Sequence, residues 1–150
     1  EGNTLENIKQ SAISIGSEMT FYREAGWVEN VTILNNTIRD VGFDPVMHLS
    51  GTHVPGAISL FHRGATPETA RPNMHIRAIN ILRNTIEEVG GPAIHINQSE
   101  DVYVFGNTIS GSNLLSQSST GSDYDLDTTQ PISIDFSKDI HVYPAPSVNP

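Results

Sequence analysis

Two glutamates near the N-terminus are of the residue type that cleaves glycosidic bonds. Glu18 and Glu24 lie within residues 16–28, a segment that also contains three aromatic residues, Phe21, Tyr22 and Trp27. One carboxyl group can protonate a glycosidic oxygen while a second activates water, and aromatic ring faces stack on the C–H surfaces of sugars. The segment therefore indicates a carbohydrate site, with Glu18 and Glu24 as the candidate catalytic acid and base.

A structural role for the same segment is the competing interpretation. Its aromatic side chains would pack the segment onto the fold, and Glu18 and Arg23 would form a solvated ion pair. The separation of the two catalytic carboxyl groups distinguishes the interpretations, because inversion needs about 6.5 to 9.5 Å and retention about 5 to 5.5 Å. If Glu18 and Glu24 point apart, hydrolysis by this pair is excluded.

Two later segments carry polar side chains that suit the same kind of site. Residues 42–56 and 61–73 contain aspartate, histidine and arginine, which can donate and accept hydrogen bonds with sugar hydroxyl groups. The predicted substrate-binding residues of all three segments are Tyr22, Trp27, Asp44, His48, His62 and Arg63.

The sequence predicts no metal site and no cofactor. No two histidines in these segments have the i, i+2 or i, i+4 spacing of a usual zinc site. The run Asp123-x-Asp125-x-Asp127 begins like a calcium loop, but Thr128 and Ile134 stand where its glycine and final glutamate are expected. We therefore interpret residues 110–130 as a polar loop.

A repeat in the sequence must position these segments. Triplets of the form Asn-Thr-aliphatic begin at four asparagines, the last two of which are 23 residues apart. A period of this size, built from short β-type runs without a helical stretch, is typical of a solenoid. The predicted fold is therefore all-β, a right-handed parallel β-helix of about four coils with loop insertions. The four asparagines are Asn3, Asn36, Asn84 and Asn107.

Each coil is predicted to contain two further strands. The second strands begin near Ala12, Ala57, Ala93 and Pro131, and the third strands at Val31, Ile79, Val102 and Ile140. Alternation directs the aliphatic side chains of these strands into the interior. The asparagines of successive coils are predicted to form a ladder of side-chain amides. His95 alternates with core residues and is expected to be an ordinary surface residue.

The composition limits the class of protein. A chain of 150 residues, with 37% hydrophobic and 17% charged residues, has material for one domain. No apolar run is long enough to span a membrane. The formal net charge of −9 argues against nucleic acid and anionic membranes as partners. The sequence has no cysteine, which excludes disulfides, and it has three glycosylation sequons, at Asn30, Asn35 and Asn97.

The two ends of the chain differ in character. The β-helix domain is predicted over residues 1–143, and a proline-rich tail that cannot continue a strand ladder over residues 144–150. Because the sequence enters directly at the turn asparagine Asn3, we expect the domain to be the C-terminal part of a longer β-helix. An N-terminal coil without a cap exposes strand edges, so self-association through this coil is expected.

The repeats and the acidic segment resemble a known family. The stretches NTLENIKQSAISIGSEMTFYREAGWVENVTILNNTIRDVG and INILRNTIEEVGGPAIHI are similar to the β-helix repeats of carbohydrate-active proteins. They most resemble glycoside hydrolase family 110, inverting α-galactosidases with an aromatic-Glu-small-Gly turn, which residues 22–26 match. The sequence departs from the family at Ser17-Glu18, where paired aspartates are expected, and at His62 or Arg63, where a further acid is expected.

This resemblance implies a carbohydrate-active module that binds glycans or hydrolyses α-galactosides. Its partner would be a polysaccharide or oligosaccharide, and its location would be extracellular or periplasmic after secretion. The alternative is a non-catalytic structural or adhesive solenoid, or an inactive fragment of a larger polysaccharide-processing protein. Both remain open because hydrolases, lyases, epimerases and adhesins share the repeat.

Overall fold

The computed structural model describes residues 1–17, 26–43, 56–62, 75–115 and 129–143 of the chain. These parts form strands and turns, and they include no helix and hence none that could cross a membrane. The strands are β1 (Thr4–Ile8), β2 (Ile13–Ser17), β3 (Val28–Leu34), β4 (Thr37–Val41), β5 (Ile58–His62), β6 (Ile76–Leu82), β7 (Thr85–Val89), β8 (Ile94–Asn97), β9 (Ser99–Phe105), β10 (Thr108–Ser110), β11 (Ile132–Asp135) and β12 (Lys138–Tyr143).

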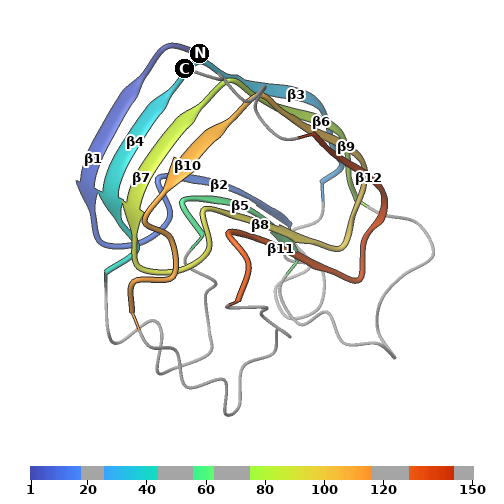
Figure 1. Cartoon of the computed structure of the whole chain (residues 1–150). Helices are drawn as coiled ribbons and strands as arrows, with labels where there is room; N and C mark the ends of the chain where they lie inside the picture. Colours follow the sequence, from blue (N-terminus) through green and yellow to red (C-terminus); the bar gives the residue numbers. More distant parts are fainter. Residues whose placement is uncertain (18–25, 44–55, 63–74, 116–128, 144–150) are drawn as a thin grey trace.

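The strands form three parallel sheets that run along the stack of coils (Figure 1). The first sheet has the order β1-β4-β7-β10, the second β11-β8-β5-β2 and the third β12-β9-β6-β3. Three consecutive strands make one coil, so coil one is β1 to β3 and coil four is β10 to β12. Each coil contributes one strand to every sheet, which confirms the predicted all-β parallel β-helix of about four coils.

The register of the sheets agrees with the repeat in the sequence. In the second sheet Ile94 is the partner of Ile58 on one side and of Ile132 on the other. Ile58 pairs in turn with Ile13. Equivalent residues of successive coils therefore stack above one another, as the alignment of the strands predicts.

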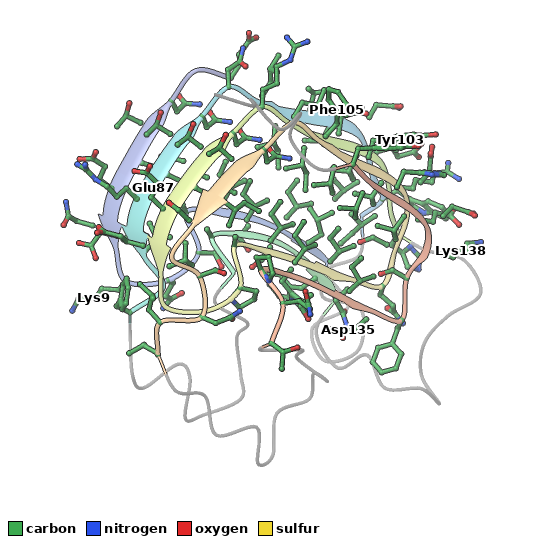
Figure 2. All side chains as sticks on the ribbon, viewed as in Figure 1. Lys9, Glu87, Tyr103, Phe105, Asp135 and Lys138 are labelled. Atoms are coloured by element: carbon green, nitrogen blue, oxygen red, sulfur yellow. The ribbon has the colours of Figure 1, made fainter. Side chains whose placement is uncertain are left out.

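Aliphatic side chains fill the interior between the three sheets (Figure 2). Ile58 and Leu60 of β5 and Ile94 and Ile96 of β8 are all fully buried. Burial of one such side chain stabilises the folded state by roughly 1.5 to 3 kcal/mol. One coil alone has no second layer to cover its apolar side, so this core forms only when coils stack.

A residue in the left-handed conformation turns the chain from the third sheet into the first. It directly precedes the ladder asparagine, and φ is 66° at Gly2, 54° at Asn35, 53° at Arg83 and 66° at Gly106. Glycine and asparagine adopt this conformation at low cost, whereas a long side chain such as that of Arg83 does not. The Arg83 N–H donates to the carbonyl of Phe105 at 3.0 Å, which holds this corner in place.

The asparagines after these corners form the predicted ladder. The amide Nδ2 donates to Oδ1 of the next coil, from Asn3 to Asn36 at 3.0 Å, from Asn36 to Asn84 at 2.9 Å and from Asn84 to Asn107 at 2.9 Å. The backbone N–H of each donating residue bonds to the same oxygen. Asn36 and Asn84 are only 2% and 1% exposed, so little water can replace a lost partner.

The ladder predicts different costs for one substitution at two of its positions. Asn84→Leu should lower the free energy of unfolding by about 1 to 3 kcal/mol, because the amide groups of neighbouring coils then lose a buried partner. Asn3→Leu, at a ladder position that is exposed in this structure, is the matched control and should cost less. Urea denaturation measures both values. Equal costs at the two positions would show that ladder burial does not stabilise the fold.

Candidate functional site

The structure describes two of the residues that were predicted to form the site. Trp27 lies just before β3 and is 52% exposed, and His62 is the last residue of β5. The Cα register partner of His62 is Ser17, the last residue of β2. The expected position of the His62 backbone beside the residue before Glu18 is thereby confirmed. The other predicted residues lie outside the described part of the chain, and they are Glu18, Tyr22, Glu24, Asp44, His48 and Arg63.

Most of the predicted site connects to the solenoid at the corner between the second and third sheets, whereas Asp44 and His48 belong to the segment that joins β4 of the first sheet to β5 of the second. Residues 18–27 join β2 to β3, and residues 63–75 join β5 to β6. In coil three the same connection is a single residue, Gln98, between β8 and β9. The two N-terminal coils therefore carry inserted segments at a corner that coil three closes with a tight turn.

Trp27 is the centre of a polar cluster at this corner. The Trp27 cluster consists of Trp27, Glu29, His75 and Arg77. The indole and imidazole rings of Trp27 and His75 are 5.0 Å apart at an angle of 65°, and the Arg77 Cζ atom lies 4.8 Å from the indole centroid. Arg77 also donates from Nη2 to Glu29 Oε2 at 3.0 Å. Two neighbours, His75 and Arg77, therefore contact the exposed indole, and Glu29 in turn holds Arg77.

The register of the third sheet brings these residues together. Val28 pairs with Ile76, and the Val28 N–H donates to the carbonyl of His75 at 2.8 Å. Ile76 is buried in the core. Residues on either side of this inward-facing pair project outward. Trp27 and His75 consequently meet on the outer face on one side of the pair, and Glu29 and Arg77 meet on the other.

The Trp27 cluster combines the two kinds of contact that sugars need. An exposed indole offers a flat apolar surface to pyranose C–H groups. A guanidinium group has five N–H donors, so Arg77 can contact a ligand hydroxyl while it remains bonded to Glu29. The cation–π contact contributes about 0.5 to 1 kcal/mol at an exposed position. The cluster thus combines an exposed aromatic ring with an adjacent ion pair.

A second polar group lies on the outer side of the second sheet, in coils three and four. His95 Nε2 and Asp135 Oδ2 are 2.7 Å apart, and the side chains are 0% and 7% exposed. The expectation that His95 is an ordinary surface residue is therefore wrong. The alternation of side chains correctly predicts that His95 lies on the outer side of the sheet. It does not predict whether other residues cover that side.

The three sequons differ in accessibility. Asn30 and Asn35 are exposed, whereas Asn97 at the end of β8 is fully buried. A folded chain can therefore present the first two side chains, but not Asn97, to a glycosylating enzyme.

Sequence reasoning missed the partners of Trp27 and of His95, although the sequence contains a signal for the first. The offset of 48 residues between Val31 and Ile79 also aligns Trp27 with His75 and Glu29 with Arg77. Within the described ranges, no group of three or more His, Asp or Glu residues is arranged to hold a metal ion.

Comparison of the chain with protein-family models gave no match. Comparisons with the curated proteins and with the solved structures gave none either. The class of protein is therefore defined by the fold and the site alone. It is a parallel β-helix that carries the Trp27 cluster, with its exposed indole and its Arg–Glu ion pair, at one corner.

The contact between His95 and Asp135 predicts a difference between a buried polar pair and an exposed ion pair. Asp135→Ala should destabilise the fold by about 1 to 3 kcal/mol, because the buried imidazole loses its carboxylate partner. Glu6→Ala is the control, since the pair that Glu6 forms with Arg39 at 2.8 Å is exposed and should contribute at most about 1 kcal/mol. Thermal melts of both variants give the comparison, and an Asp135→Ala melt like that of the control would contradict this role.

Proposed function

We propose that the chain is a carbohydrate-active β-helix module that binds a polysaccharide or oligosaccharide at the corner between the second and third sheets. The Trp27 cluster forms the described part of this site, and the predicted catalytic pair, Glu18 and Glu24, belongs to the segment that ends beside it. The proposed reaction is hydrolysis of an α-galactoside, in line with the resemblance of the sequence to glycoside hydrolase family 110.

One observation carries the binding part of the proposal, namely that Trp27 is 52% exposed and yet held by named contacts. Large aromatic side chains in proteins usually bury most of their surface. An indole that contacts Arg77 and His75 but is still open to solvent is oriented before a ligand binds. Such pre-organisation lowers the entropic cost of binding. A glycan gains from both the indole surface and the neighbouring charged donors.

The catalytic part rests on position in the chain. Glu18 directly follows β2, and Trp27 precedes β3 by one residue, so the segment that contains Glu18 and Glu24 begins and ends at this corner. His62 ends the neighbouring strand, which brings the segment that begins with Arg63 to the same corner. A glycan bound to the Trp27 cluster would therefore contact coils one and two together.

Substitution of Trp27 tests binding separately from catalysis. Trp27→Ala should weaken glycan binding by about tenfold or more, which corresponds to about 1.4 kcal/mol, because the sugar loses its stacking surface. Tyr143→Ala is the matched control, since Tyr143 is 50% exposed but belongs to coil four, far from this corner. Calorimetric titration across a glycan panel is the measurement. Equal losses for the two variants would exclude the Trp27 cluster as the binding site.

Substitution of the two glutamates tests catalysis. Glu18→Gln and Glu24→Gln should each reduce hydrolysis of an α-galactoside by about 10²-fold to 10⁴-fold, the usual contribution of a general acid or base. Binding measured by calorimetry should persist in both variants. If the unsubstituted protein binds glycans but cleaves none, the module is a binding protein. If it neither binds nor cleaves any, the chain is a structural solenoid and the proposal is wrong.

A further inference from the structure

Exposed aromatic side chains lie on the outer face of the third sheet in coils three and four. Tyr103 and Phe105 of β9 and Tyr143 of β12 are 40%, 45% and 50% exposed. Figure 2 shows Tyr103 and Phe105 on the outer side of the solenoid. His141 of β12 is the register partner of Tyr103, and we call these four residues the aromatic patch. Adjacent exposed aromatic rings on a protein surface often mark a contact with another molecule.

The rings of the aromatic patch pair across the two strands. Tyr103 and His141 are stacked, with their ring centroids 4.7 Å apart and an interplanar angle of 16°. Phe105 and Tyr143, which are also register partners, meet at 6.2 Å and 64°, an edge-to-face arrangement. Both geometries are favourable contacts between aromatic rings. Each of these two rows therefore joins one ring of β9 to a different ring of β12.

A charged row on the same face has the same construction. Glu100 of β9 and Lys138 of β12 are register partners, and Lys138 Nζ lies 2.6 Å from Glu100 Oε2. The hydrogen bond to Glu100 raises the pKa of Lys138, so the ammonium group stays charged at neutral pH. The Lys138 side chain is 50% exposed. This row therefore presents an acid on β9 and an accessible base on β12.

A face whose rows join unlike partners is complementary to itself. A two-fold axis that lies in the contact plane, parallel to the strands and midway between β9 and β12, exchanges these two strands between copies. It places each residue of β9 opposite its own register partner in the second copy. The facing pairs are Glu100 with Lys138, Tyr103 with His141, and Phe105 with Tyr143. Every charge and every ring then faces the kind of group that it already contacts within its own chain.

From this self-complementarity we infer that the chain forms a two-fold symmetric dimer through the aromatic patch, with β9 of each copy facing β12 of the other. The contact uses the lateral face of the solenoid and neither end of the coil stack. It belongs to coils three and four, so the Trp27 cluster of coils one and two is not part of it. Because only two strands contribute, the contact is smaller than that of an obligate dimer. Dimerisation is therefore reversible and depends on concentration.

Exchange of the charges tests the proposed axis, because two defective variants should then repair each other. Lys138→Glu alone makes Glu100 face a glutamate of the second copy, and Glu100→Lys alone makes Lys138 face a lysine. Each variant should therefore dimerise at least about tenfold more weakly. An equimolar mixture of the two restores opposite charges at every facing position and should form a heterodimer close to wild-type affinity. Lys9→Glu, the same charge change after β1 in the first sheet, is the control and should not alter association.

Sedimentation velocity over a range of concentrations measures these affinities, with a fluorescent label on one variant to identify the heterodimer. Circular dichroism checks that each variant folds. Wild-type protein that stays monomeric at every concentration would overturn the inference. A mixture that associates no better than either variant alone would also overturn it, because Glu100 and Lys138 would then not face each other.

Two aromatic substitutions separate dimerisation from the proposed glycan binding. Phe105→Ala should weaken the dimer at least about tenfold, because the patch loses one of its rings, and should leave glycan affinity unchanged. Trp27→Ala, at a similarly exposed residue outside the patch, should weaken glycan binding and leave the dimer unchanged. If Phe105→Ala instead lowers glycan affinity and leaves association unchanged, the patch is a glycan surface and the dimer is wrong.

Discussion

In-register stacking of coils is the constraint on which the whole structure depends. No coil can bury its own apolar side chains, so every buried isoleucine requires an equivalent residue in the coil above or below. The asparagine ladder fixes that register, because each buried amide has its partner at the same position of the next coil. A slip of one residue would turn the aliphatic side chains outward and would also separate the amides.

The constraint also explains where function can reside. Residues inside the solenoid and at its asparagine corners contact the equivalent residues of neighbouring coils, so they cannot vary without loss of the stacking. The corner between the second and third sheets is different, because coils one and two accommodate long segments there whereas coil three needs only Gln98. Trp27 and His75 stand where those segments rejoin the third sheet, and stacking orients them without restricting their solvent-facing surfaces. The proposed glycan site lies at this variable corner, next to strands whose positions the stacking fixes.

Much of the fold could be predicted from the sequence, because the residue pattern of one coil recurs several times along the chain. The recurring Asn-Thr-aliphatic triplets predicted the strands of the first sheet and the asparagine ladder. The recurring strands such as the one that begins at Ile94 predicted the second sheet. The site was less predictable. The neighbours of Trp27 could have been found from the same register, but the burial of His95 could not. Its partner Asp135 is 40 residues away and diagonal to it in the sheet, and alternation does not reveal what covers an outer face.

The unequal spacing of the ladder asparagines has a thermodynamic consequence. Neighbours in the ladder are separated by 48 residues between coils two and three but by only 23 between coils three and four. Loop-closure entropy grows with the logarithm of length, so doubling a loop costs only about 0.6 kcal/mol. Burial of a single isoleucine exceeds that cost. Lengthening or exchanging a corner segment therefore changes what the protein contacts far more than it changes the stability of the frame, which makes the frame a scaffold suited to new loops.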